Sequence, residues 1–533
     1  MATLVLTLTR TATRFVLVLS ALCLFAENPE GRMLDASIEQ LQVQLESGSI
    51  TSVELVRWYQ ERIDQYDQKG PSINAIQHAN PDALVIAQDL DEERQKSGAR
   101  SLLHGIPVLV KDNYETRGMP TTAGSVLFDG HSPDRDATQV ERLKKAGAIV
   151  LAKTTMHEFA YGWTTEGSAF GTTKNPYGPT RHPGGSSGGT GAAVAANFAA
   201  VGMGSDTCGS IRVPSAHNNL VGLRGTQGLS SRSGIVPLSS TQDIGGPLAR
   251  SVGDLAIVLD VTVGFDASDP QTTASVGKIP ESYYEALSTL DPSTLRLGLL
   301  EDWFGTDLEE IELGNRVKAL LAILESEGAE VIELRSPRVN ESLSGTPFFV
   351  SEVDFRKDMT AYLAANPALG FSSLISLLEE PRIVTNVANL LRSLLGPAHE
   401  SELDYLRQRA QRRTIRGALL TLMHEHRLDA LVYPTATREA AEIGKPHTHF
   451  NCQLAANSGL PAISVPAGFG PNQMPIAIEF LAESWSEQKL LNLALTVETL
   501  SPARKPPSFT CLLYTSDAAD ERSSVDLGGR RII

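Results

Sequence analysis

Cysteine is scarce in this sequence. Four cysteines in 533 residues cannot form a disulfide framework, and no CxxC pair is present, so structural zinc is not expected. Away from the two ends of the chain only Cys208 and Cys452 remain. They could pair in an oxidising compartment, but a loop cysteine and a distant one give no reason to expect it, and whether they are free stays open.

Basic residues are also few. Lys and Arg number 46 against 62 Asp and Glu, which gives a net charge of −16. A chain this acidic lacks the excess of positive charge that binds nucleic acid, and its charge would not attract it to an anionic membrane. With 41% hydrophobic and 20% charged residues the composition is that of a globular protein, which excludes global disorder. The sequence does not indicate an oligomeric state.

Long apolar runs are absent except near the N-terminus. There Arg10 and Arg14 precede the apolar run 15–26, and Glu27 is the first acidic residue. About twelve apolar residues after a basic segment are typical of a secretory signal and too few to span a bilayer comfortably. We therefore expect residues 1–26 to be a signal segment and the protein to be secreted or to enter the secretory pathway. A mitochondrial presequence is the alternative.

The C-terminal segment has the opposite character. Residues 511–533 are polar and irregular, and they resemble the translation of a sequencing adapter over their whole length. We expect this segment to be an unstructured library artefact and the natural chain to end near Phe509.

Between these ends the pattern indicates an α/β fold. A strand-like run at 106–110 is followed by a helical stretch at 137–146 and a second strand at 148–152. Residues 162–253 hold 19 of the 44 glycines, interleaved with apolar runs, which predicts a packed region rather than a linker. Further elements are expected as helices over 36–66 (with Ser52 as an N-cap), 82–97 and 307–327, mostly helix over 345–425, and strands at 295–300, 331–334, 428–432 and 462–465.

Three places could carry chemistry. Lys111 ends a buried-looking strand, where a lysine is costly unless it is paired or neutral, and a desolvated lysine can act as a base. Ser186 and Ser187 lie in a glycine-flanked segment that opens an apolar helix. In the segment 204–212, small residues leave a row of backbone N–H groups free before Ser210, which suits an oxyanion beside a nucleophilic hydroxyl.

Together these segments resemble the amidase signature family of serine hydrolases. The resemblance covers nearly all of residues 36–505, which we expect to be one amidase signature domain. It rests on these segments: LHGIPVLVKDN at 103–113, KTTMHEFA at 153–160, GTTKNPYGPTRHPGGSSGGTGAAVAA at 171–196, GSDTCGSIRVPSA at 204–216, GLRGTQG at 222–228 and NSGLPAISVPAGF at 457–469. The fold it implies is an α/β/α sandwich with a large mixed central sheet.

The resemblance implies a Ser–Ser–Lys triad formed by Lys111, Ser186 and Ser210, with a cis peptide bond at Ser186. Ser210 would attack the amide carbonyl while Lys111 draws its proton through Ser186. The oxyanion would be held by backbone N–H groups of Thr207, Cys208, Gly209 and Ser210. Supporting roles fall to Asp206, Arg212 and Ser187. The family often has glycine where this chain has Cys208.

The predicted activity is hydrolysis of a linear carboxylic amide to an acid and ammonia or an amine through an acyl-enzyme, with no cofactor and no metal. The alternatives are the glutaminase-type A subunit of a tRNA-dependent amidotransferase and a catalytically silent binding protein on the same scaffold. Which amide is cleaved is not readable, although segment 340–400 is expected to shape the pocket. His157-Glu158 lacks the second histidine of a zinc-protease motif, and His447 and His449 are interpreted as solvated loop residues.

Overall fold

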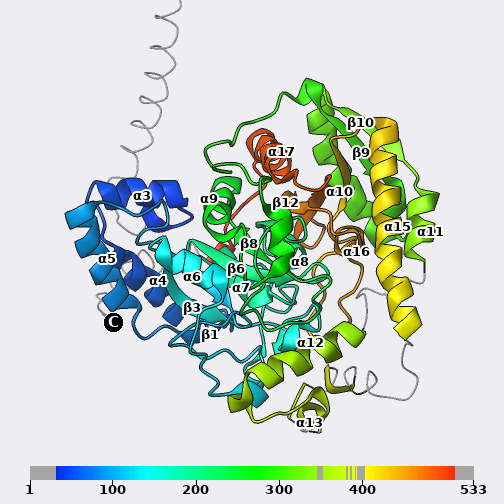
Figure 1. Cartoon of the computed structure of the whole chain (residues 1–533). Helices are drawn as coiled ribbons and strands as arrows, with labels where there is room; N and C mark the ends of the chain where they lie inside the picture. The colour runs from blue at the N-terminus through cyan, green and yellow to red at the C-terminus, as the bar shows by residue number, and fades with distance from the viewer. Residues whose placement is uncertain are drawn as a thin grey trace, which may run out of the picture.

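The computed structural model describes residues 32–344, 352–379, 382–384, 387–389, 392 and 402–509. The predicted signal segment 1–26 and the predicted adapter segment 511–533 lie outside these ranges. The dominant feature is a mixed sheet of 11 strands in the order β1-β3-β2-β6-β8-β7-β12-β13-β11-β9-β10 (Figure 1). This large mixed sheet with helices packed on it confirms the α/β class expected from the sequence.

One half of the sheet carries parallel strands. β2 (Pro107–Lys111) lies between β3 (Ile149–Thr154) and β6 (Val201–Asp206) and is parallel to both. β1 (Ile76–Ala79) is antiparallel to β3 at the edge. Because the carboxyl ends of parallel strands meet at one edge, the residues that end β2 and β6 come together there.

The middle of the sheet is antiparallel. It consists of β8 (Ile244–Ala249), β7 (Val221–Arg224), β12 (Ala462–Phe469) and β13 (Pro475–Leu481). The far edge is built from β11 (Ala430–Pro434), antiparallel to β13, and from β9 (Arg296–Leu300) and β10 (Glu330–Leu334), which follow as parallel neighbours. A separate hairpin pairs β4 (Glu166–Gly167) with β5 (Gly171–Thr172).

Helices cover the sheet in contiguous layers (Figure 1). In one layer α6 (Thr138–Lys145), α9 (Val252–Thr262), α17 (Glu487–Leu500) and α10 (Leu308–Ser326) contact one another in turn. Elsewhere α7 (Gly188–Ala195) contacts α8 (Arg212–His217), and α15 (Glu402–His426) contacts α16 (Gln453–Ser458) and α11 (Pro337–Leu343).

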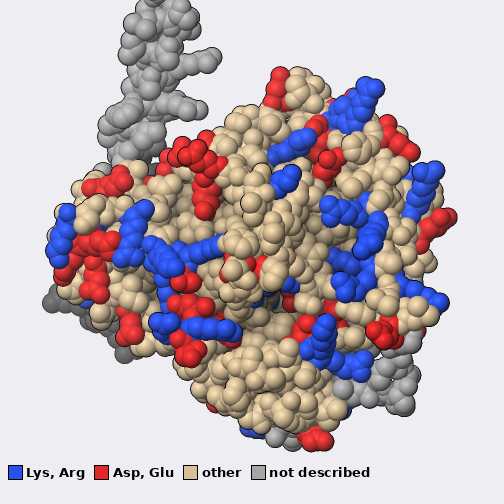
Figure 2. All heavy atoms as spheres, in the orientation of Figure 1, with Lys and Arg blue, Asp and Glu red and all other residues tan. Residues whose placement is uncertain are grey.

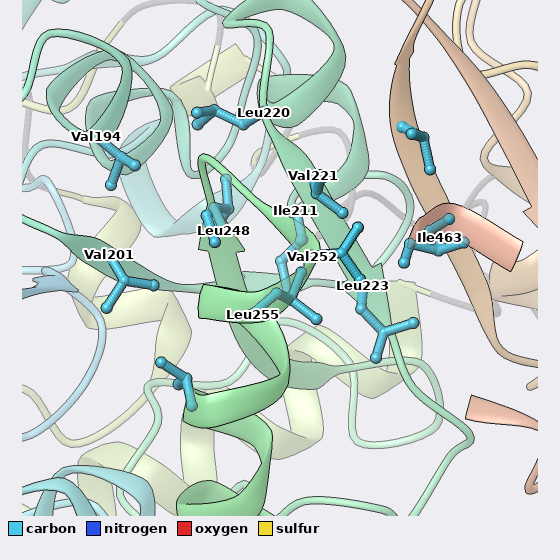
Figure 3. Close-up of a cluster of buried hydrophobic side chains, with 14 of the residues drawn as sticks. Val194, Val201, Ile211, Leu220, Val221, Leu223, Leu248, Val252, Leu255 and Ile463 are labelled. Carbon is cyan, nitrogen blue, oxygen red and sulfur yellow. The ribbon is translucent and has the colours of Figure 1, made fainter. Parts of the chain in front are cut away.

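The core reaches the residue next to the predicted nucleophile. Ile211 packs among Leu223 of β7, Leu248 of β8 and Val252 of α9 (Figure 3). All four side chains are buried. Burial of a large apolar side chain is worth about 1.5–3 kcal/mol, so the core holds the backbone of Ser210 in place.

The N-terminal helices are α3 (Ile38–Glu46), α4 (Ser52–Tyr66) and α5 (Ala83–Ser97). The expectation that Ser52 caps a helix is wrong by one residue. Thr51 is the N-cap of α4, because its side chain accepts from the N–H of Glu54 while Glu54 reaches back to the N–H of Thr51. Near the other end of the described chain, Phe509 packs against Tyr66 with ring centroids 5.2 Å apart.

The segment expected to shape the pocket forms short helices, α12 (Glu352–Ala365) and α13 (Leu374–Leu378). They lie together, where Figure 2 shows a surface almost free of charged side chains. Within the described ranges no single helix is long and apolar enough to cross a bilayer. One pair of helical segments, Val353–Ala365 and Pro367–Leu378, is long and apolar enough when taken together, but it is bent by 94°. Short 3-10 turns complete the fold at Val126–Phe128, Glu158–Ala160, Pro270–Ser275, Pro292–Thr294, Glu301–Trp303 and Pro367–Leu369.

Candidate active site

Lys111 is the last residue of β2 and has no exposed surface. Its Nζ donates to Ser186 Oγ at 2.7 Å and to Ser205 Oγ at 2.8 Å. Burial lowers the pKa of Lys111 to about 7, although the nearby carboxylates of Asp243 and Asp206 act to raise it. At neutral pH a large share of these amines is therefore uncharged and able to accept a proton.

Ser186 and Ser187 lie where the chain enters α7. The Gly185–Ser186 peptide bond is cis, as the resemblance implied. Ser187 Oγ donates to the carbonyl of Ser205 at 3.2 Å, and the N–H of Ser187 donates to the carbonyl of Ser210 at 3.3 Å. The backbone at Ser187 thus holds the two serine segments against each other.

Glycines in β6 let these serines approach the sheet. A Cβ at Gly204 would lie 2.9 Å from Ser187 Oγ and 2.7 Å from Leu248 Cδ1, and one at Gly202 would lie 2.4 Å from Thr190 Cγ2. Only glycine leaves this space. The glycine-rich region is therefore closely packed, as predicted. The first turn of α7 packs directly against β6, which carries Ser205 and lies beside β2, which carries Lys111.

The loop from Thr207 to Ser210 joins β6 to α8. Ser210 is 4% exposed, and Gly209 has a φ of +86°, which favours glycine. The N–H of Gly209 already donates to Asp206 Oδ1 at 2.8 Å. In the part of the chain that the structure describes, no protein acceptor contacts the N–H groups of Thr207, Cys208 or Ser210. Three of the four predicted oxyanion donors therefore have no acceptor among the residues that the structure describes.

Asp206 ties this loop to two buried arginines. Its carboxylate pairs with Arg212 Nε at 3.1 Å and with Arg224 Nη1 at 2.8 Å, and it also accepts from the N–H of Ile211 at 3.2 Å. Burial would raise the pKa of Asp206, but the two guanidinium groups hold it well below its usual value. The side chain of Arg212 also pairs with Glu479 of β13. Asp206 and Arg212 thus connect the loop that carries Ser210 with the neighbouring strands.

Two polar residues at the site, Ser205 and Asn113, were not singled out from the sequence. Ser205 Oγ accepts from Lys111 and from Asn113 Nδ2, the latter at 3.0 Å. Placing 201–206 as a strand parallel to β2 would have brought Ser205 to Lys111, but the glycines of this segment hide its strand character.

A disulfide corrects the sequence-based view of the cysteines. Cys208 and Cys452 are bonded, across a sequence separation of 244 residues, and each is 1% exposed. The pair was not expected because only the folded chain brings α16 beside the loop from Thr207 to Ser210.

A cavity of about 430 Å³ lies next to the segments that carry Ser186 and Cys208, although neither of these residues lines it. His157, in its wall, donates its backbone N–H to the carbonyl of Ser186 at 3.0 Å, and Trp163, also in the wall, donates from Nε1 to the carbonyl of Cys208 at 2.9 Å. Val387, from the segment expected to shape the pocket, lines the same cavity. A second cavity of about 350 Å³ is lined by Ser205, Asp243 and Tyr362, among others.

The expectation that His447 is solvated is wrong. Its ring is buried, Nδ1 donates to the carbonyl of Trp163 at 2.9 Å, and Nε2 lies 3.1 Å from Nε2 of His217. A carbonyl only accepts, so Nδ1 carries the proton and His217 donates to Nε2. Burial lowers the pKa of His447 well below its usual value. His449 is partly exposed and contacts Glu310 at 3.0 Å.

Neither His157 nor Glu158 is placed to form a zinc-protease site. Burial lowers the pKa of His157 to about 3, and the nearby His182 and Lys111 act in the same direction. Glu158 accepts from Ser168 Oγ at 2.5 Å and from the N–H of Val384 at 2.7 Å. Among the described residues there is no group of three or more His, Cys, Asp or Glu side chains arranged to hold a metal ion.

Comparison with known proteins decides the family. The family model described as Amidase matches residues 54–491. The chain belongs to the amidase family. It is a C–N hydrolase that acts on amides.

Curated and solved members of the amidase family are similar over nearly their whole length. A probable amidase of Arabidopsis thaliana is 32% identical, with 89% of this chain and 92% of that protein covered. The A subunit of the glutamyl-tRNA(Gln) amidotransferase of Ralstonia nicotianae is 31% identical, with 87% and 97% covered. The solved peptide amidase of Stenotrophomonas maltophilia has a TM-score of 0.82 and 34% identity, with 89% and 98% covered.

Proposed function

We propose that this amidase cleaves its substrate through Ser210 as nucleophile, Ser186 as proton relay and Lys111 as base. The observation that carries the proposal is the 2.7 Å contact between Lys111 Nζ and Ser186 Oγ, made by a buried amine whose pKa is about 7. Lysine and serine in hydrogen-bond contact are a base and a hydroxyl ready for proton transfer. The bond from Ser187 N–H to the Ser210 carbonyl keeps the second serine beside the first.

The acylation step balances without a cofactor. Neutral Lys111 takes the proton of Ser186, which takes the proton of Ser210, and Ser210 Oγ forms a bond to the amide carbon. The carbonyl π electrons move to the oxygen and give a tetrahedral oxyanion. When that oxyanion collapses the C–N bond breaks, and the proton returns from Lys111 through Ser186 to the leaving nitrogen. The products of this step are an acyl-enzyme and ammonia or an amine.

Backbone N–H groups of the loop from Thr207 to Ser210, here called the nucleophile loop, would stabilise the oxyanion. The N–H groups of Thr207, Cys208 and Ser210 have no acceptor among the described residues and can donate to it, while that of Gly209 is directed at Asp206. One such donor is typically worth about 2.7–4 kcal/mol of transition-state stabilisation. Water, deprotonated along the same Lys111–Ser186 path, then attacks the acyl-enzyme and releases the acid.

The substrate we propose is a linear amide with one bulky group. The cavity of about 430 Å³ has Tyr161 and Trp163 in its wall, and two of its wall residues, His157 and Trp163, donate to the carbonyls of Ser186 and Cys208. Aromatic walls favour an apolar or aromatic group. Turnover of a panel of primary amides that differ in acyl length tests this, because kcat/KM should rise with acyl size until the cavity is full. Equal kcat/KM across the panel would contradict the assignment.

The alternative of an amidotransferase component has support in sequence, since several relatives that match this chain are A subunits of glutamyl-tRNA(Gln) amidotransferases. Structural similarity favours the free-standing enzyme. The TM-score is 0.67 for the A subunit from Thermotoga maritima and 0.82 for the peptide amidase. Release of ammonia from simple amides by the purified chain alone separates the two. Dependence on added partner proteins would support the amidotransferase.

A silent binding protein on the same scaffold is disfavoured by the intact site. Ser210→Ala and Lys111→Met should each abolish amide hydrolysis. Ser288→Ala and Lys489→Met, which change an exposed serine and a lysine paired with Asp429 at the surface, serve as matched controls. Full activity in Ser210→Ala would overturn the proposed nucleophile.

We also propose that the protein works in an oxidising compartment, reached through a signal segment at residues 1–26. The Cys208–Cys452 disulfide supports this, because disulfides persist in secreted and secretory-pathway proteins and are rare in the cytosol. Expression of the full chain in a secreting host, followed by N-terminal sequencing, tests it. We expect secreted protein that begins after residue 23 or residue 26, whereas an uncut cytosolic protein or a mitochondrial one would contradict the proposal.

A further inference from the structure

The Cys208–Cys452 disulfide is built into the nucleophile loop itself. Cys208 lies two residues before Ser210, and Cys452 is the N-cap residue of α16. Both sulfurs are enclosed, with Ala456 as an apolar neighbour. The bond therefore joins the loop that supplies the oxyanion donors to a helix from the far end of the chain.

The other contacts hold the loop on both sides of Cys208. Asp206 binds the N–H groups of Gly209 and Ile211, and Thr207 Oγ1 donates to Asp243 at 2.6 Å. Cys208 itself is held by its carbonyl, which accepts from Trp163, and by the disulfide. The covalent bond thus restrains the side chain of Cys208, whose N–H has no acceptor in the described part of the chain.

Gly209 makes the loop sensitive to this restraint. It has a positive φ, and a Cβ there would lie 3.0 Å from Cys452 Cβ and 2.9 Å from Val213 Cγ2. The loop backbone thus rests directly on Cys452. Two thiols need more room than two bonded sulfurs, so breaking the bond forces the loop and α16 apart.

We propose that the Cys208–Cys452 disulfide is a positioning element of the hydrolase, which holds the Cys208 N–H where it stabilises the oxyanion. The oxidised enzyme is then the fast form and the reduced enzyme the slow form. The inference rests on the proposed catalytic role of Ser210. Reduction by a dithiol transfers two electrons and two protons to the sulfurs, which leaves two thiols on the enzyme and a cyclic disulfide on the reductant.

The test compares kcat and KM of the oxidised and the dithiothreitol-reduced enzyme on one small primary amide. Loss of a whole oxyanion donor costs about 10²–10³ in kcat. We expect reduction to lower kcat by about 10-fold or more, with KM changed by less than about 3-fold, since the donor acts on the transition state. Reoxidation should restore kcat. Rates are expressed per folded molecule, with the melting temperature of each form measured in the same buffer.

Cys452→Ala supplies the matched variant, because it breaks the bond from the side that does not face the reaction. Its kcat should be lower than that of the oxidised enzyme, because the covalent restraint is lost even without the crowding of two thiols, and it should not respond to dithiothreitol. Equal kcat in oxidised and reduced folded enzyme, or a loss confined to KM, would overturn the inference. Failure of the catalytic assignment looks different, because Ser210→Ala would then stay active even with the disulfide intact.

Discussion

Lys111 Nζ lies 2.7 Å from Ser186 Oγ, in a position with no access to solvent. The contact joins the end of a central strand to the start of a helix, 75 residues apart in the chain. It is possible because β2 and β6 end at the same edge of the sheet and because the glycines of β6 let α7 approach. The chemistry proposed above depends on this one contact.

The pH dependence follows from the pKa of Lys111. The amine must be neutral to accept a proton, and its pKa is lowered to about 7, so kcat/KM should rise through about pH 7 and level off above it. A pH profile from about 5 to 11 on an amide without ionisable groups spans both this pKa and the ordinary lysine value and measures the midpoint. Lys489→Met, at a surface ion pair, should keep the same midpoint. A midpoint near the ordinary lysine value of about 10 would show that the base is not a desolvated lysine.

Ser205→Ala removes the second acceptor of Lys111. Ser205 Oγ accepts from the Nζ at 2.8 Å, and a hydrogen bond to the charged ammonium favours that form. Without it the midpoint of the pH profile should move to lower pH, and kcat should fall by about 10-fold as the amine loses its alignment. A midpoint that moves upward or stays in place would contradict this role.

Asp206→Asn should damage both stability and turnover. The variant leaves Arg212 and Arg224 without their shared buried carboxylate, and breaking a buried pair typically costs about 3–5 kcal/mol. Urea unfolding measures the loss. Glu92→Gln, which breaks an exposed pair with Lys96, should cost about 1 kcal/mol or less. Similar small losses in both variants would mean that the cluster does not support the loop.

The Asp206 carboxylate also predicts how the stability of the protein changes in acid. The pKa of Asp206 is held below its unfolded value, so its contribution to stability is present above about pH 4 and is lost as the pH falls further. The stability gap between Asp206→Asn and the wild-type protein should therefore narrow in strong acid. A gap that is the same at about pH 3 and about pH 7 would argue against the ion pairs.

Gly204→Ala tests the close packing of α7 on β6. The added methyl group would lie 2.7 Å from Leu248 Cδ1 and 2.9 Å from Ser187 Oγ, so either the helix start or the strand must move. We expect a loss of about 1–3 kcal/mol of stability and a fall in kcat. Gly417→Ala, in α15 with open space around it, should instead gain about 0.5–1 kcal/mol. Wild-type kcat in Gly204→Ala would show that the packing does not set the geometry.

Local sequence patterns predicted much of this fold. The strand that ends at Lys111, the following helix–strand pair and the helix over 308–326 were expected within a few residues, because their apolar periodicity is clear. β8 was not expected, since two glycines and a proline in Ile244–Ala249 resemble a loop. The cap of α4 fell on Thr51 because Glu54 completes the capping box there.

Contacts between residues far apart in the chain could not be predicted from local sequence patterns. Lys111, Ser186 and Ser210 could be named because each lies in a recognisable segment. The bond between Cys208 and Cys452, the role of Ser205 and the burial of His447 all depend on which distant elements the sheet order brings together. No local pattern records that information.

The central claim is that Ser210 is the nucleophile, activated by Lys111 through Ser186. Its most direct test is to map the covalent adduct of a fluorophosphonate probe by mass spectrometry of the intact oxidised enzyme and its peptides. We predict one adduct, on Ser210, formed with the pH dependence of Lys111 deprotonation and strongly slowed in Lys111→Met. An adduct on another residue, or labelling that persists in Ser210→Ala, would contradict the account.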